Sequence, residues 1–91
     1  MSVQVEFYGI ARQRAGVASC QIPLTDECTT LGAVLRELAT RFPAFGQRCC
    51  EQDRLRSDYI ANLGGEQFVR DSDTPICQGQ TLLILSADAG G

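Results

Sequence analysis

The chain has 91 residues, 44% of them hydrophobic and 21% charged, which fits one globular domain with a modest core and excludes a disordered chain. Eight arginines, no lysine and eleven acidic residues leave a formal charge of −3, which argues against a nucleic-acid backbone as partner because phosphate binding needs clustered cations. The chain has no histidine, the commonest general base and metal ligand, and no lysine to form a Schiff base, so we do not expect it to catalyse a reaction alone.

The first predicted element is a strand over residues 3–8, where two valines and a phenylalanine alternate with polar residues. A period of two is typical of a strand with one buried face. Residues 9–16 begin and end with glycine, which predicts a loop of hairpin length. A second strand over roughly residues 18–24 is then expected to pair back antiparallel to the first.

The next predicted element is an amphipathic helix that starts at Thr30. Apolar residues recur there at helical spacing, with arginine and glutamate on the opposite face. Thr29 or Thr30 can supply the N-cap hydroxyl. Pro43 sets the end of the helix, because the residue before a proline is displaced from the helical region. The predicted apolar face consists of Leu31, Val34, Leu35, Leu38 and Phe42.

The second half of the chain predicts three strands. Residues 44–58 are mostly polar and are expected to form an irregular connection with room for one short turn of helix. Residues 59–69 predict a hairpin around Gly64 and Gly65. Residues 70–80, rich in Asp, Pro and Gly, predict a loop before a last strand over 81–86.

These elements predict an α+β fold with one main helix and a mixed sheet of four to five strands. Residues 1–85 would form the domain, and 86–91 a flexible tail ending in two glycines. The last strand is apolar on both sides, and one helix covers only one sheet face, so Leu83 and Leu85 are expected on an uncovered face that binds a partner. The alternative is that segment 44–58 packs over them.

The chain shows no sign of a membrane segment. Its longest aliphatic run is the four residues 82–85, against about 20 needed to cross a bilayer, and the first residues lack the pattern of a secretion signal. We therefore expect a cytoplasmic protein that does not enter a membrane.

The five cysteines are odd in number and lack a C-x-x-C pair, which indicates neither a disulfide framework nor a zinc site. We expect all of them to be reduced, with Cys20 as a small buried apolar residue on the second strand. Adjacent Cys49 and Cys50 could chelate a soft metal or be redox active, but no other ligand lies beside them, so ordinary loop cysteines are the preferred interpretation.

Several stretches in register resemble the ubiquitin-like sulfur carriers of the β-grasp fold (the MoaD/ThiS family), in particular the small subunit of molybdopterin synthase. VEFYGIARQRAG (5–16) has the aromatic pair, small residue, arginine and closing glycine of the family's opening. TTLGAVLRELATRFP (29–43) resembles its helix, DSDTPICQGQTLLIL (71–85) its acidic loop, turn and final strand, and AGG its tail. Family tails commonly contain prolines and a valine, where this chain has Ser86–Ala89.

The resemblance implies a function for the tail. The Gly91 carboxylate would be adenylated with ATP by a separate activating enzyme and converted to a thiocarboxylate that donates sulfur, with Gly90 giving the tail flexibility. No cofactor or metal would be bound. The implied partners are the adenylating enzyme, a sulfur donor protein and the large synthase subunit, with no nucleic acid and no membrane. The residues expected to contact partners are Phe7, Arg12, Leu83, Leu85 and Ala89, although Arg12 is also compatible with a solvated loop.

Three functional hypotheses remain open from the sequence. The preferred one is a sulfur carrier in molybdopterin (molybdenum cofactor) biosynthesis, with carriers of the thiamine, cysteine or tRNA thiolation routes as variants. The second is a ubiquitin-like modifier or interaction domain without sulfur chemistry. The third is a thiol-dependent metal or redox protein that uses Cys49 and Cys50.

Overall fold

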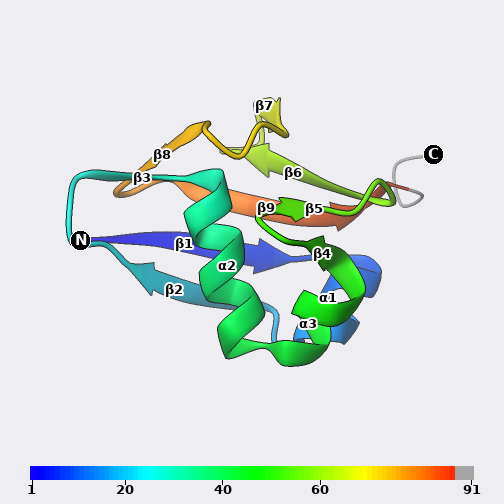
Figure 1. Ribbon diagram of the computed structural model, residues 1–91. Helices are drawn as coiled ribbons and strands as arrows, with labels where there is room; N and C mark the ends of the chain where they lie inside the picture. The colour runs from blue at the N-terminus through cyan, green and yellow to red at the C-terminus, as the bar shows by residue number, and fades with distance from the viewer. Residues whose placement is uncertain (88–91) are drawn as a thin grey trace.

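The computed structural model describes residues 1–87 and contains a mixed five-stranded sheet with the strand order β2-β1-β9-β6-β7 (Figure 1). Strands β1 and β9 are parallel, and the other neighbouring pairs are antiparallel. β9 is therefore the central strand, as its apolar sequence predicted. The strands of this sheet are β1 (Ser2–Phe7), β2 (Ser19–Pro23), β6 (Tyr59–Leu63), β7 (Gln67–Val69) and β9 (Thr81–Ser86).

The described residues also form three helices and two short ladders. The helices are α1 (Gly9–Ala15), α2 (Leu31–Arg41) and α3 (Pro43–Cys49). β3 (Cys28–Thr30) pairs with β8 (Pro75–Cys77), and β4 (Cys50–Glu51) pairs with β5 (Arg54–Leu55). Helix α2 crosses one face of the sheet, and α1 and α3 lie at the end where β1 and β9 finish (Figure 1). No helix among residues 1–87 is long and apolar enough to cross a bilayer.

Helix α2 forms where the apolar periodicity predicted it. The Thr30 side chain accepts a hydrogen bond from the Ala33 N–H at 3.2 Å, which satisfies one of the unpaired donors of the first turn. The helix ends at Arg41, just before Phe42 and Pro43. Its predicted apolar face lies in the core, with Leu31, Val34, Leu35 and Leu38 each at most 1% exposed.

The predicted loop at residues 9–16 is instead helix α1, so that prediction was wrong. Gly16 adopts the left-handed conformation (φ +80°), and its N–H donates to the Arg12 carbonyl, which closes a helix rather than turning a hairpin. The residues between the two glycines favour helix, and burial of Ala11 anchors the helix to the core.

Two further segments are more ordered than the sequence indicated. Pro43 ends α2 and also occupies the first turn of α3, where its missing N–H costs nothing. Phe45 and Cys49, four residues apart, bury the inner face of α3 completely. Ladder β4–β5 follows within the predicted irregular connection. β8 lies within the predicted loop 70–80 and pairs with β3, a contact too distant in sequence to be read from local pattern.

The cysteines differ in part from the expectation of reduced thiols. Cys28 and Cys77 face each other in the β3–β8 ladder, with Cα atoms 3.9 Å apart, and form a disulfide across a sequence separation of 49. The prediction of reduced thiols was wrong for this pair, because the pairing of β3 with β8 is not visible in the local sequence pattern. Cys20, Cys49 and Cys50 are free thiols.

Candidate functional site

The candidate site begins at the end of β9, the last strand before the predicted tail. Ser86 is paired in register with Tyr59 and is 6% exposed. The N–H of Ala87 then donates to the carbonyl oxygen of Asp58 at 2.8 Å. The chain is therefore held against β6 up to residue 87. The predicted tail residues Ala89, Gly90 and Gly91 lie outside the described residues.

The sheet face opposite the helices carries an apolar surface. Leu82 and Ile84 point into the core and are completely buried, whereas Leu83 and Leu85 alternate with them and stay partly exposed. The structure thus gives β9 the two apolar faces that the sequence predicted. We call the outward residues of β6, β7 and β9 the open face; its apolar members are Ile60, Phe68, Leu83 and Leu85.

Segment 44–58 does not provide the alternative cover for this face. Phe45, Cys49 and Cys50 belong to the core cluster, together with the inward residues of β9. Helix α3 and ladder β4–β5 accordingly lie on the helical side of the sheet in Figure 1. Among the described residues, Leu83 and Leu85 therefore remain available to a partner.

Two members of the open face were not identified from the sequence. Phe68 is 70% exposed, an unusual position for a large aromatic side chain. Asn62, its cross-strand neighbour, is 7% exposed, and its Oδ1 has no hydrogen-bond partner among the described residues. A buried unpaired polar atom costs about 1–3 kcal/mol. The alternation of β6 could have placed Asn62 on this face, but its burial depends on the neighbouring strands.

Phe7, which the sequence analysis assigned to partner binding, is a core residue. It is 1% exposed and packs edge to face against Phe42 and Phe45, with ring centroids 5.9 and 5.2 Å away. We correct that assignment, because Phe7 points to the helical side of the sheet and has no surface to offer a partner. The two aromatic residues of the motif differ in burial, since neighbouring Tyr8 is 41% exposed.

Arg12 is exposed on α1 and not on a loop. It lines a small surface pocket with Glu6 and Tyr8. The Tyr8 hydroxyl donates to Glu6 Oε1 at 2.6 Å, and this bond raises the pKa of Tyr8. Arg12 makes neither of the two ion pairs found among residues 1–87.

Cys49 and Cys50 are buried beside β6 and are held as thiols. Burial, followed by the neighbouring Cys49, raises the pKa of Cys50 to about 12. Burial also raises the pKa of Cys49, against the opposing effect of its hydrogen bond with Tyr59. Raised pKa values disfavour the thiolate that metal binding and nucleophilic attack require. Residues 1–87 contain no cluster of three metal-ligating side chains.

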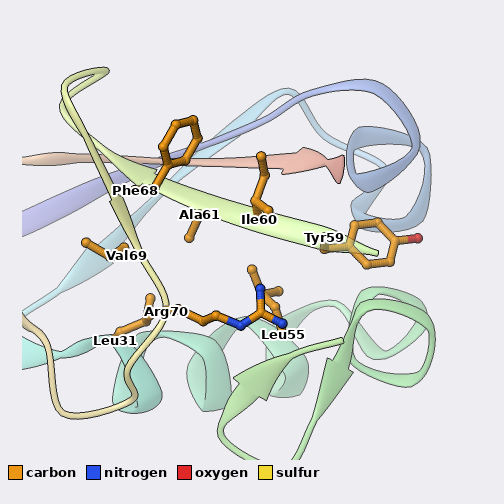
Figure 2. A pocket seen from close by; sticks show the side chains of 8 residues that line it. All are labelled: Leu31, Leu55, Tyr59, Ile60, Ala61, Phe68, Val69 and Arg70. Carbon is orange, nitrogen blue, oxygen red and sulfur yellow. The ribbon is translucent and has the colours of Figure 1, made fainter. Parts of the chain in front are cut away.

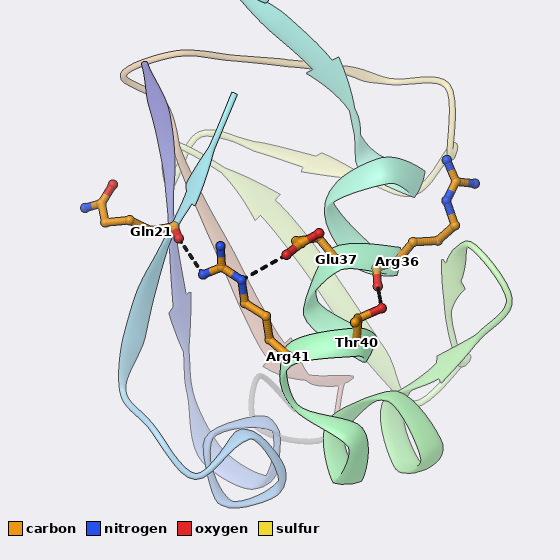
Figure 3. A network of polar contacts seen from close by, with 5 residues as sticks. All are labelled: Gln21, Arg36, Glu37, Thr40 and Arg41. Atoms are coloured by element: carbon orange, nitrogen blue, oxygen red, sulfur yellow. Dashed lines mark hydrogen bonds and ion pairs between the residues drawn. The ribbon is translucent and has the colours of Figure 1, made fainter. Parts of the chain in front are cut away.

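One carbonyl on the edge strand β2 is bonded by a side chain of α2. Arg41 Nη1 donates to the Gln21 carbonyl at 2.8 Å, while Arg41 Nε pairs with Glu37 Oε2 at 3.0 Å (Figure 3). A strand edge whose polar groups are already bonded pairs less readily with another strand, and this contact occupies one such group. Pro23, which lacks an N–H, further weakens this edge as a docking strand.

Comparison with known proteins found no matching family model and no matching curated protein. Solved structures do match over nearly the whole chain. SAMP1 from Haloferax volcanii superposes with a TM-score of 0.82 at 20% identity, covering 100% of both chains. The putative molybdopterin converting factor subunit 1 from Pyrococcus furiosus gives 0.76 at 18% identity, covering 94% of this chain and 97% of that one.

A third match comes from the Amycolatopsis orientalis BexX/CysO complex, with a TM-score of 0.71 at 21% identity over 98% of this chain and 99% of that one. At these identities the likeness concerns the fold. The resemblance seen in the sequence is therefore confirmed at that level: this chain has the ubiquitin-like β-grasp fold of the small modifier and molybdopterin converting factor proteins.

Proposed function

We propose that this protein is a sulfur carrier whose Gly91 carboxylate is activated and converted to a thiocarboxylate. The observation that carries the proposal is the attachment of the tail: central strand β9 runs directly toward the glycines, and the N–H of Ala87 is bonded to Asp58. The four residues 88–91 reach at most roughly 14 Å when extended, at about 3.3–3.6 Å each. A rigid base limits the ordering cost when such a tail enters another protein's active site.

The chemistry needs a partner for each step. A carboxylate is a poor electrophile, so an activating enzyme would join it to the α-phosphate of ATP and release pyrophosphate. Sulfide supplied by a sulfur donor would then attack the acyl carbon and displace AMP, leaving a thiocarboxylate on Gly91. This covalent route divides one difficult substitution into easier steps. Gly90 and Gly91 carry no Cβ, so they can pass through a narrow channel.

The partners would dock on the open face and beside the tail. Leu83 and Leu85 supply the apolar contact predicted from the sequence, and Phe68 extends it toward the sheet edge. Arg12 supplies a charge on α1, at the end of the sheet where β9 finishes. We propose that the adenylating enzyme, the sulfur donor protein and the large synthase subunit are these partners, and that they meet the chain in the cytoplasm.

Molybdopterin synthesis is the pathway we propose first. The opening EFYG (6–9) and the overall length resemble that branch, and the Pyrococcus furiosus protein of similar fold bears the name putative molybdopterin converting factor subunit 1. In that role the chain would be the non-catalytic small subunit of a synthase. Carriers for thiamine, cysteine or tRNA thiolation would use the same tail chemistry with a different acceptor.

A protein modifier is the second candidate function. The observation that favours it is the match to the H. volcanii small archaeal modifier protein 1, with a TM-score of 0.76 at 19% identity. A modifier would use the same activated Gly91, but a lysine amine of another protein would displace AMP. The two candidates therefore differ only in the nucleophile of the second step.

The product of the second step distinguishes them. The chain is incubated with an adenylating enzyme that loads carriers of this fold, together with ATP and a sulfide source. Its intact mass is then measured. Replacement of one oxygen atom by sulfur supports the carrier. Conjugates of the chain with lysines of added proteins, without sulfur exchange, support the modifier. An unchanged mass in the presence of an enzyme that loads its own carrier contradicts both.

A further inference from the structure

An apolar pocket opens at the edge of the sheet where β7 ends, between β6, β5 and the start of α2. Its volume is about 310 Å³, at the lower end of the range of ligand sites, which suits one large side chain and its neighbour. Leu31, Leu55, Ala61 and Val69 form its walls, Phe68 stands at its rim, and Arg70 crosses it (Figure 2). The predicted chemistry of the tail does not use this pocket, and the core side chains do not fill it.

Arg70 is the only charged residue that lines the pocket. Its side chain is directed toward Leu55, so that a guanidinium group lies against an apolar wall (Figure 2). Arg70 takes part in neither of the two ion pairs found among residues 1–87. Asp71, its sequence neighbour, instead accepts the N–H of Asp73 at 2.9 Å. An unpaired guanidinium beside an apolar cavity selects a ligand that combines an apolar group with a carboxylate.

The position of the pocket indicates where such a ligand comes from. Ile60 and Phe68 belong both to the pocket lining and to the open face, so a protein seated on that face reaches the pocket rim. Tyr59, also in the lining, follows Asp58, whose carbonyl oxygen holds Ala87. The pocket is therefore continuous with the open face and adjoins the Asp58–Ala87 contact at the base of the tail. A protein that holds the tail would cover both.

We propose that this pocket receives a bulky apolar side chain with an adjacent carboxylate, presented by the protein that takes the C-terminal tail. The apolar side chain fills the space between Leu31, Leu55 and Ala61, and Arg70 binds the carboxylate. The proposal rests on the proposed function, since it identifies the partner as the one that holds the tail. The tail itself, Asp88 to Gly91, has no large apolar side chain with which to fill the cavity.

The probe is an acetylated and amidated dipeptide of phenylalanine and glutamate, compared with its phenylalanine–glutamine analogue. Binding to the full chain is followed by amide chemical shifts. We expect saturable shifts at residues 59–61 and 68–70, with the glutamate peptide bound about three- to tenfold more tightly, as for a partly exposed charge-assisted contact. Arg70→Gln should remove this preference, and Arg48→Gln, on α3, should retain it. Phe68→Ala should weaken both peptides.

Several results would overturn the proposal. They are shifts that do not saturate, shifts that map elsewhere, or a glutamate preference that survives Arg70→Gln. Concentration-dependent shifts of the same amides without peptide would assign the pocket to a second copy of the chain and would also overturn it. The variants affect exposed side chains, and an unchanged shift pattern outside the pocket verifies that each one folds.

Loading of Gly91 separates this proposal from the proposed function. With the adenylating enzyme, Arg70→Gln should raise KM for the chain about threefold or more and leave kcat unchanged, because the contact is made equally before and during the reaction. If Gly91 loads normally but Arg70→Gln alters neither peptide binding nor KM, only the pocket assignment is wrong. If the peptide binds as expected but Gly91 never accepts AMP or sulfur, the carrier role is wrong.

Discussion

The N–H of Ala87 donates a 2.8 Å hydrogen bond to the carbonyl oxygen of Asp58, one residue before β6 begins. This bond continues the β6–β9 ladder past Ser86, the last residue of β9. It therefore holds the backbone against β6 through residue 87, the last residue before the predicted glycine tail.

Replacing Ala87 by proline tests the importance of this bond, because proline has no N–H to donate. We expect a loss of about 0.5–1.5 kcal/mol in the free energy of unfolding, as for one hydrogen bond, together with a higher KM in Gly91 adenylation. Ala87→Ser retains the N–H and is the matched control. Urea unfolding and pyrophosphate release measure the two effects. Equal KM values for the two variants would show that the fixed base of the tail is unimportant.

Substitutions of Phe7 and Leu83 should distinguish the effect of core packing from the effect of partner binding. Phe7→Ala should cost about 3–5 kcal/mol of stability, because it removes a buried ring from the contact with Phe42 and Phe45. Leu83→Ser, on the open face, should change stability much less and weaken binding to the adenylating enzyme. Chemical denaturation and calorimetric titration measure these effects. Unimpaired binding by a folded Leu83→Ser variant would exclude the open face as the docking surface.

The crossing of α2 and α3 depends on Gly46. A Cβ added at Gly46 would lie 2.7 Å from the Cβ of Ala39 and 3.0 Å from its Cα, closer than atoms pack. Gly46→Ala should therefore lower the free energy of unfolding by about 1–3 kcal/mol, the usual cost of overpacking. The double variant Ala39→Gly, Gly46→Ala should recover part of that loss. A neutral Gly46→Ala substitution would contradict the close approach.

The Cys28–Cys77 disulfide should contribute substantially to stability. It closes a loop with a sequence separation of 49, for which the restriction of the unfolded chain is worth roughly 2–4 kcal/mol. A phosphine reductant should lower the melting temperature of the native chain and leave that of the double variant Cys28→Ser, Cys77→Ser unchanged. Mass analysis after alkylation counts the free thiols. Five alkylated cysteines in the chain unfolded without reductant would contradict the disulfide.

Cys50 should make stability depend on alkaline pH. The pKa of its thiol rises from the ordinary value of 9.0 to about 12 in the folded chain, first because of burial. Below pH 9 the thiol is protonated in both the folded and the unfolded chain, so its contribution to stability is fully present. Between pH 9 and 12 the thiol ionises in the unfolded chain but not in the folded chain, so the free energy of unfolding falls. Cys50→Ala should make this fall less steep in urea melts. Identical slopes for the two proteins would contradict the raised pKa.

Local pattern was sufficient for the elements whose apolar residues face one core. Alternation located β1, an apolar run after a loop rich in Asp, Pro and Gly located β9, and helical spacing located α2 with its Thr30 cap. The local pattern did not predict the elements that depend on contacts distant in sequence. Helix α1 depends on the burial of Ala11, and strand β8 depends on its pairing with β3. The disulfide was missed for the same reason, since Cys28 and Cys77 meet only through that ladder.

The candidate site was predictable to a similar extent. Two apolar faces on one strand placed Leu83 and Leu85 on the surface, because a single helix covers only one side of a sheet. The same alternation places Phe7 in the core, and the family motif had assigned it to partner binding instead. Arg70 and the pocket beside it could not be predicted, because the pocket walls come from β5, β6, β7 and α2, which only the tertiary structure brings together.

The most direct test of the central claim is to locate the sulfur atom after loading. The native chain and a variant lacking Gly91 are each treated with the adenylating enzyme, ATP and a sulfide source, and their C-terminal peptides are sequenced by tandem mass spectrometry. We predict oxygen-to-sulfur replacement in the Gly91 carboxylate of the native chain and no sulfur in the variant, which should keep the same melting temperature. Sulfur on a cysteine side chain, or equal loading of both proteins, would contradict the account.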